Sequence, residues 1–358
     1  MESEAAIHTL TLRHPFGLSR GSVDALPTVL LRLTIGDQAP GYGEAAPVRY
    51  LGQTAPAERL ALLSLLAEVT RDPTLLDDHP RRAAWADQRA PEHSAARAAL
   101  DIAAWDLAAR RAALPLYEHL GAPAPGAAAV TSYTIALDEL DAMEQRAREA
   151  SHLPILKIKL GRDPAHDRAA IRRIAAAAPR ARLRVDANGG WSFGHAEEFI
   201  PELAELGVDL IEQPLPRGAH DQLHLLRGRG PLIFADEDVQ GLSSLLALRG
   251  RVDGINIKLM KAGGITPALD MIAFARAEGW KILLGCMIET RIGLSAAAQL
   301  AGLVDALDLD AHLLTVDDPV PPGSAAALSP ELPLSRGLGL AAELPRAREL
   351  HRRSVRPV

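Results

Sequence analysis

The stretch that decides the fold is Leu156-Lys-Ile-Lys-Leu-Gly161, a short aliphatic run that carries two lysines. Lysine and aliphatic side chains alternate in it, so in an extended strand Lys157 and Lys159 point to the same face. Further along, four charged residues each end another aliphatic run and precede a polar turn: Asp186, Glu212, Asp236 and Lys258. The intervals from Lys159 onward are 27, 26, 24 and 22 residues, enough for one strand, one helix and two loops each time. This ladder predicts charged side chains on one rim of a parallel barrel.

The sequence pattern from about residue 129 onward supports this interpretation. Short aliphatic runs alternate there with helical intervals, a pattern that predicts a (β/α)-barrel with functional side chains at the C-terminal ends of its strands. The expected strands are 130–136, 154–160, 182–186, 208–212, 232–235, 254–258, 281–285 and 304–308.

The first third of the chain has a different pattern, with strand-like runs followed by alanine-rich helical ones. We expect strands at 6–12 and 28–35, loops at 16–22 and 41–52, and helices at 56–69 and 92–112. The proline- and glycine-rich run Gly121–Gly126 is a candidate linker. Beyond residue 318, prolines and glycines indicate an extended tail, which we expect to return to the N-terminal lobe.

Composition excludes several classes of protein. At 358 residues and 48% apolar, the chain suits a barrel with a second lobe, and a net charge of −6 argues against a nucleic-acid partner. The single Cys286 allows no intrachain disulfide. The acidic start leads into no apolar segment, and no apolar run reaches the roughly 18 residues of a membrane span. We therefore expect a cytoplasmic protein with no membrane partner.

The three carboxylates of the ladder indicate a metal site. Acids at the ends of consecutive strands give an oxygen-only ligand set, which favours a hard cation such as Mg²⁺. The alternative is that each acid caps the helix that follows it. That alternative explains any one acid well, but it explains three in register poorly.

The lysines of the ladder indicate proton transfer. Buried lysines are rare unless they are paired, so one alternative is that they only bridge the acids. As a base, a lysine needs a pKa below its ordinary value near 10.4, and burial, a neighbouring ammonium and a divalent cation all lower it. Removing a proton next to a carboxylate builds a dianionic enediolate, which needs positive charge around it.

Taken together, these segments make the chain resemble the enolase superfamily, in its muconate-lactonizing-enzyme subgroup, over nearly its full length. The matching segments are Ala98-Ala-Leu-Asp-Ile-Ala-Ala-Trp-Asp-Leu107, Leu156-Lys-Ile-Lys-Leu-Gly161, Val185-Asp-Ala-Asn188, Ile211-Glu-Gln-Pro214, Ala235-Asp-Glu237 and Asn256-Ile-Lys-Leu-Met-Lys-Ala-Gly-Gly264. The resemblance implies an α/β fold, a modified (β/α)7β TIM-type barrel with an α+β capping domain. Residues 1–125 would form the capping domain and 126–318 the barrel, with 319–358 returning to the capping domain.

The resemblance also implies roles for the ladder. Lys159 and Lys258 would be opposed acid/bases, and Lys157 would hold down the pKa of Lys159 and help neutralise the enediolate. One Mg²⁺ per subunit would be bound by three acids: Asp186, Glu212 and Asp236. Members of the family tend to form homo-oligomers, so we expect one here.

Two later segments resemble those of dipeptide epimerases: Gly285-Cys-Met-Ile-Glu-Thr290 and Asp308-Leu-Asp310. In that family the paired aspartates bind the free α-ammonium of the substrate, and two carboxylates suit a group with three N–H donors. The alternative is an ordinary acidic loop. Where family members often continue with Pro or Gly-Pro, this chain has Ala311-His312, a departure that bears on the preference for the N-terminal residue.

Other candidates surround this site. The resemblance places Met287 and Glu289 among the substrate-binding residues. Arg20 could bind the side chain or carboxylate of the second residue, or it could be an ordinary solvated arginine. Cys286 is interpreted as a small packed residue and not as a nucleophile. Specificity is expected in the capping loops near residues 17–23 and 47–54.

The sequence thus predicts an Mg²⁺-dependent dipeptide epimerase. It would invert the α-carbon of the C-terminal residue of a dipeptide by two-lysine 1,1-proton transfer through an enediolate. Alternatives in the same subgroup are a muconate cycloisomerase or o-succinylbenzoate synthase-like lyase and an N-acylamino acid racemase. Their substrates lack the α-ammonium, so Asp308 and Asp310 argue against them. A non-catalytic metal- or peptide-binding protein is the remaining alternative, and the two lysine arms disfavour it.

Overall fold

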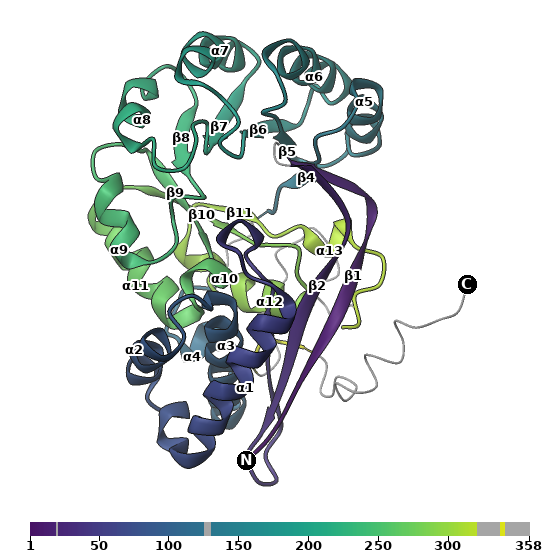
Figure 1. Cartoon of the computed structure of the whole chain (residues 1–358). Helices are drawn as coiled ribbons and strands as arrows, with labels where there is room; N and C mark the ends of the chain where they lie inside the picture. The colour runs from purple at the N-terminus through teal and green to yellow at the C-terminus, as the bar shows by residue number, and fades with distance from the viewer. Residues whose placement is uncertain (19–20, 125–129, 321–336, 341–358) are drawn as a thin grey trace.

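An antiparallel sheet with its helices forms the N-terminal part of the structure, and alternating strands and helices follow it (Figure 1). The computed structural model describes residues 1–18, 21–124, 130–320 and 337–340. The N-terminal strands are β1 (Glu2–Leu18), β2 (Gly21–Thr34) and β3 (Gly41–Ala45), paired in that order. The N-terminal helices are α1 (Ala55–Arg71), α2 (His79–Arg89), α3 (Ser94–Ala112) and α4 (Leu116–His119), with short 3-10 turns at Arg49–Leu51 and Pro73–Leu76.

The long β1–β2 ribbon corrects the loop expected at 16–22. Phe16 pairs with Val23 and Gly17 with Ser22, so β1 continues to Leu18 and β2 begins at Gly21, while residues 19 and 20 lie outside the described part of the chain. The Gly17 carbonyl accepts a hydrogen bond from the backbone of Leu137 at 3.1 Å, and a side chain at Gly17 would overlap the carbonyl of Leu137. The small residues therefore permit close contact with the barrel, and that contact keeps the segment extended (Figure 1).

Strand β3 corrects the first part of the loop expected at 41–52. All five residues of Gly41–Ala45 are buried, and β3 pairs with β2. A Cβ at Gly43 would overlap the carbonyl oxygen of Ala99 in α3, and one at Gly41 would overlap that of Ala103. The glycines here mark the close approach of a helix to a strand, which in sequence looks the same as a flexible turn.

Gly43→Ala is therefore expected to destabilise the protein by about 1–3 kcal/mol, the range for overpacked cores. The measurement is the urea midpoint of unfolding. The matched control is Gly194→Ala in helix α7 (Phe193–Glu205), where nothing lies within 4 Å of an added Cβ. That control should be neutral or stabilising, and equal losses in the two variants would contradict the packing argument.

The second sheet forms the barrel. In the described residues it has eight parallel strands in the order β11-β10-β9-β8-β7-β6-β5-β4, and a bridge between Thr131 and Leu307 brings its edges together. The strands are β4 (Tyr133–Ile135), β5 (Ile155–Lys159), β6 (Arg182–Asp186), β7 (Val208–Glu212), β8 (Leu232–Ala235), β9 (Gly254–Lys258), β10 (Lys281–Gly285) and β11 (Ala306–Asp308). The predicted capped barrel is confirmed, and five of the expected strands have the bounds found for β6 to β10.

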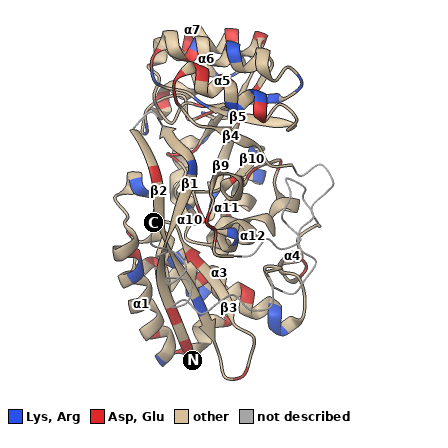
Figure 2. Cartoon of the chain, turned by 90° about the vertical axis from the view of Figure 1, so that its right-hand side faces the viewer, with Lys and Arg blue, Asp and Glu red and all other residues tan. Residues whose placement is uncertain are grey.

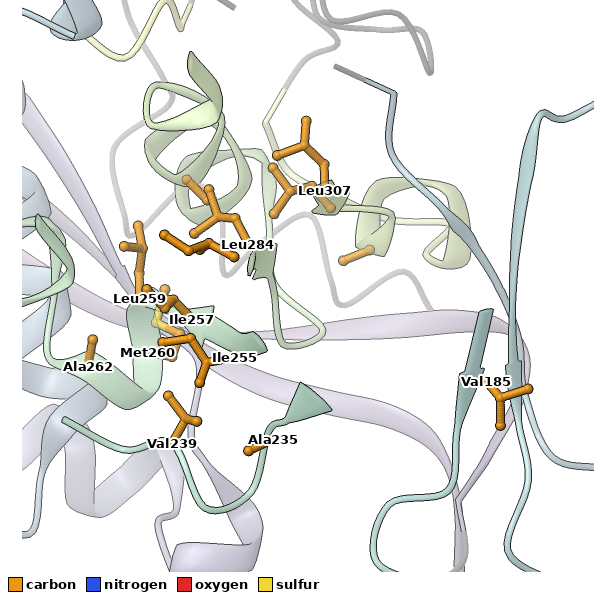
Figure 3. Close-up of a cluster of buried hydrophobic side chains, with 14 of the residues drawn as sticks. Val185, Ala235, Val239, Ile255, Ile257, Leu259, Met260, Ala262, Leu284 and Leu307 are labelled. Atoms are coloured by element: carbon orange, nitrogen blue, oxygen red, sulfur yellow. The ribbon is translucent and has the colours of Figure 1, made fainter. Parts of the chain in front are cut away.

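Helices follow the strands of this barrel. They are α5 (Leu140–Glu149), α6 (Pro164–Ala177), α7, α8 (His220–Leu226), α9 (Leu242–Leu245), α10 (Leu259–Ala262), α11 (Ile265–Ala277), α12 (Arg291–Ala298) and α13 (Ala311–Leu314). Aliphatic side chains such as Val185, Ile257 and Leu284 belong to the core cluster between the strands and these helices (Figure 3). By alternation, the neighbouring Asp186 and Lys258 point to the interior. A separate cluster of Leu210, Phe234 and Leu283 fills the interior one layer further down the strands.

Part of the C-terminal segment contacts the N-terminal part of the chain, and charged residues of both signs lie on the surface helices. Gly337 exchanges backbone hydrogen bonds of 2.9 Å with Leu114 and Leu116, so this part of the C-terminal segment lies against the end of α3 and the start of α4. Basic and acidic residues are interspersed along α5 to α7 (Figure 2). Among the described helices, none combines the length and hydropathy that a membrane span requires.

Candidate functional site

Three acids meet at the C-terminal rim of the barrel. Asp186 and Glu212 end β6 and β7, and Asp236 directly follows β8. All three are buried, and one carboxylate oxygen of each lies within 4.8 Å of the others. Their even spacing in sequence thus becomes a compact oxygen-only cluster, because adjacent parallel strands end at the same edge.

The predicted lysines surround this cluster. Lys157 Nζ lies 2.6 Å from Glu212 Oε2, 2.7 Å from Asp308 Oδ2 and 3.0 Å from Asp186 Oδ2. Lys159 Nζ donates to Asp186 Oδ2 at 2.5 Å. Lys258 Nζ donates to Asp236 Oδ2 at 2.8 Å. Since β5 and β9 are four places apart in the sheet order, Lys159 and Lys258 approach the acids from different sides.

The acids of the rim raise the pKa values of Lys157 and Lys258, whereas the sequence led us to expect lowered lysine pKa values. Burial acts to lower the pKa of Lys258, but Asp236 and Glu212 raise it well above its ordinary value. The pKa of Lys157 is raised in the same way, because Asp186, Asp308 and Glu212 outweigh its burial. A base at this rim therefore depends on positive charge that offsets the acids.

The acids fit a divalent cation. Burial and the charge of Asp186 raise the pKa of Glu212 to about 8, although Lys157 opposes that rise. Although Lys157 contacts it, the ionised form of Glu212 is thus disfavoured until further positive charge is present, as expected of a ligand whose partner is a metal. Buried carboxylates without nitrogen or sulfur ligands are the donor set that Mg²⁺ prefers.

Lys261 belongs to this site and was missed in the sequence. Its Nζ contacts the carboxylate of Asp236, donates to the Asp236 carbonyl at 2.5 Å and lies 3.3 Å from the Asn256 carbonyl. Asp236 is therefore held by two lysines, and Asn256 in turn donates to Glu212 Oε1 at 2.8 Å. The available signal was a lysine inside the apolar run that follows Lys258.

The two aspartates at the eighth strand differ in their environment. Asp308 accepts from Ser132 Oγ at 2.5 Å and from Lys157, and these contacts outweigh burial and lower its pKa. Asp310 accepts from the backbone of Thr134 at 2.6 Å. Burial and the charge of Asp308 raise the pKa of Asp310 to about 6. Two carboxylates face a single lysine here, so the pair keeps negative charge and can bind a cation.

A cavity of about 500 Å³ connects these groups. Its floor includes Lys159, Lys258 and both aspartates of the eighth strand. Its roof comes from the N-terminal part of the chain: Phe16, Val23, Leu26, Pro47, Arg49 and Tyr50. Both the barrel and the antiparallel ribbon therefore shape the site.

The remaining predicted site residues lie in different places. Met287 lines the cavity, whereas Glu289 is absent from its described lining and its carboxylate accepts from the Met287 backbone at 2.9 Å. Arg20 lies outside the described residues. Cys286 lines the cavity, but burial and then Glu289 raise its pKa well above the ordinary value, so the thiol is a poor nucleophile.

The fold and the rim define a capped parallel barrel that can hold a metal at its strand ends. Residues 3–121 match the mandelate racemase / muconate lactonizing enzyme N-terminal domain, and residues 139–347 match the enolase C-terminal domain-like family. The chain belongs to the enolase superfamily, in its mandelate racemase / muconate lactonizing enzyme group.

Several relatives are epimerases. The chain is 36% identical over 316 residues to an L-Ala-D/L-amino acid epimerase of Pedosphaera parvula, covering 87% of this chain and 88% of that one. It is 38% identical over 325 residues to a hydrophobic dipeptide epimerase of Roseobacter litoralis, covering 87% and 91%. It is also similar to the solved dipeptide epimerase of Enterococcus faecalis complexed with Mg and L-Leu-L-Tyr. That structure has a TM-score of 0.87 at 30% identity and covers 95% of this chain and 99% of its own.

Proposed function

We propose that this chain is an Mg²⁺-dependent dipeptide epimerase that inverts the α-carbon of the C-terminal residue by 1,1-proton transfer. The observation that carries the proposal is that Asp308 and Asp310 line the same cavity as Lys159 and Lys258. The same cavity can therefore bind an ammonium group and bring a proton donor and acceptor to the substrate. The epimerases among the relatives support the same reaction.

Substrate binding uses the paired aspartates and the three acids of the rim. The α-ammonium of the dipeptide would donate to Asp308 and Asp310, replacing water with charge-assisted hydrogen bonds. Asp186, Glu212 and Asp236 would hold the cation, which when bound supplies positive charge beside the substrate carboxylate. Anchoring both ends of a dipeptide fixes its second α-carbon between the lysines.

Proton transfer is assigned to two lysines. Lys159 Nζ would take the α-proton from one face of the carbon, and Lys258 Nζ would return a proton on the other face. The two lysines exchange roles when the substrate has the opposite configuration. Lys157 remains an ammonium, because Glu212, Asp186 and Asp308 all face it, and it stabilises the negative charge that develops nearby.

Solvent exchange tests the reaction directly. A library of dipeptides is incubated with the protein and Mg²⁺ in ²H₂O, and mass spectrometry and chiral chromatography follow the α-carbon. We expect deuterium at the C-terminal α-carbon together with inversion. The matched control is each active dipeptide with an acetylated N-terminus, which removes the ammonium and should lower kcat/KM on the order of 10- to 100-fold. Absence of exchange with every dipeptide would reject the proposal.

The dependence of binding on pH is a further prediction. Asp310 binds an ammonium only as a carboxylate, and its pKa is about 6. As the pH falls through that value the carboxylate is protonated, so KM is expected to rise about tenfold per pH unit below it. Above the pKa of Asp310, KM should stay constant until the substrate loses its own ammonium proton near pH 8. Asp310→Asn should raise KM at neutral pH and remove the acid limb. An unchanged limb would contradict the assignment.

A further inference from the structure

Two buried glutamates that the mechanism does not use meet beside the cavity. Glu44 lies in β3 of the N-terminal sheet, and Glu289 follows β10 of the barrel, so sequence places them 245 residues apart. Both carboxyl groups reach Gly293 in α12: Glu44 accepts from its backbone N–H, and a Cβ on Gly293 would overlap Glu289. Buried acids this close need a specific arrangement of protons and donors.

Glu44 is surrounded by donors. Its Oε1 accepts from Thr28 Oγ1 at 2.8 Å and from the Thr290 backbone at 2.9 Å. Its Oε2 accepts from Thr290 Oγ1 at 2.5 Å and from the Gly293 backbone at 3.0 Å. Each oxygen accepts from a backbone N–H, which is the pattern of an ionised carboxylate. These hydrogen bonds oppose the burial that raises the pKa of Glu44 to about 7. Two of these donors are backbone N–H groups at the start of α12, so the N-terminal sheet caps a helix of the barrel.

Glu289 has the opposite environment. Its Oε1 accepts from the backbone of Met287 at 2.9 Å, and its Oε2 is buried with no hydrogen-bond partner among the described residues. The side chain is 3% exposed. A carboxylate in such a place would leave one charged oxygen without compensation, whereas a neutral acid would not. The charge of Lys258 opposes the effect of burial, but burial and Glu44 raise the pKa of Glu289 well above its ordinary value.

The two glutamates bracket a segment of the cavity wall. Cys286, Met287 and Ile288 line the cavity, with Glu289 bonded back to Met287 and Thr290 bonded to Glu44. The position of this wall is therefore set by one carboxyl from the barrel and one from the N-terminal sheet.

We infer that Glu44, as a carboxylate, and Glu289, as a neutral acid, are positioning residues that fix the wall Cys286–Ile288 to the N-terminal sheet. The inference rests on the proposed function for its effect on turnover, since the wall faces the dipeptide. The contacts of Glu44 and Glu289 that hold this wall, called the lock below, are a property of the fold and exist without substrate. Displacing a wall by about 1 Å can lower a rate on the order of 100-fold.

Isosteric substitutions test whether Glu44 is a carboxylate and Glu289 a neutral acid. In Glu44→Gln the amide N–H₂ must face the N–H or O–H donors, so kcat should fall and KM should rise, with kcat/KM lower on the order of 10- to 100-fold. In Glu289→Gln the neutral amide replaces a neutral acid, so kinetics should stay close to wild type, while Glu289→Ala should resemble Glu44→Gln. If Glu289→Gln were as damaging as Glu289→Ala, the neutral-acid assignment would be overturned.

Glu58 provides the matched control. It is a buried carboxylate in α1 that accepts from the backbone of Ala96 at 2.9 Å and contacts His93, and it is not among the residues that line the cavity. Glu58→Gln should lower the thermal midpoint as Glu44→Gln does, but leave kcat and KM unchanged. Equal kinetic losses in both variants would show that the effect of Glu44 is only one of stability, and would overturn the inference.

Hydrogen exchange tests the lock without any turnover. The amides of Thr290 and Gly293 donate to Glu44, so Glu44→Gln should speed their exchange, while Glu58→Gln should speed that of Ala96. Unchanged exchange at Thr290 and Gly293 would overturn the inference whatever the activity. If Glu44→Gln speeds exchange at these amides but the wild-type protein epimerises no dipeptide, the inference about the wall stands and only the proposed function is rejected.

Discussion

Lys258→Ala is expected to abolish epimerisation, with a loss of at least about 10³-fold, while one configuration of the dipeptide still exchanges its α-proton with solvent. General acid–base groups contribute on the order of 10²–10⁴-fold to a rate. Inversion needs both lysines, whereas removal and return of a proton on one face needs only Lys159. The measurement follows deuterium uptake and inversion separately, starting from each configuration of the C-terminal residue.

The structure indicates that this variant will fold. Asp236 loses the partner at 2.8 Å but keeps Lys261, which contacts the same carboxylate. The control is Lys281→Ala, which removes an exposed lysine that pairs with Asp305 at the N-terminal end of β10, opposite the rim. Lys281→Ala should leave both readouts unchanged. If Lys258→Ala inverted the α-carbon at the wild-type rate, the two-base assignment would be wrong.

The local pattern of the ladder was enough to predict where its residues lie. A lysine on every second position of β5, and an acid at or just after each of the next three strands, determine the face and the end at which each side chain appears. Because parallel strands share one edge, no knowledge of long-range contacts was needed. The same reasoning predicted the bounds of the central strands.

The contacts between the two parts of the chain could not be predicted in this way. Gly43 looks like a turn residue in sequence, but it is where α3 approaches β3. Glu44 caps a helix that begins more than 240 residues later, and nothing in its local sequence carries that information. Lys261 pairs with Asp236 only because β8 and β9 are neighbours in the sheet. Such residues are recognised from tertiary packing.

Removing divalent cations is expected to have the other large effect. Chelation with EDTA should reduce epimerisation to background, because Asp186, Glu212 and Asp236 would then face one another without the charge that offsets them. Adding Mg²⁺ should restore turnover and also stabilise the fold. At about 100 times its dissociation constant, a ligand that binds only the folded state contributes about 2.7 kcal/mol. The measurement is the thermal midpoint with and without Mg²⁺, which needs no substrate.

Glu212→Gln separates metal binding from a general effect of ions on the protein. The variant keeps the size of the side chain and removes the charge that burial and Asp186 already disfavour, shown by its pKa of about 8. Either orientation of the amide places its N–H₂ against a donor, Asn256 or Lys157, so the apoprotein should be less stable than wild type, and its stabilisation by Mg²⁺ should be lost. Asp209→Asn, at a partly exposed acid of the same strand that lies outside the rim, should keep the full Mg²⁺ effect. If Mg²⁺ stabilised Glu212→Gln and wild type equally, the cation would bind elsewhere, and the three acids would be a charge network that only holds the lysines.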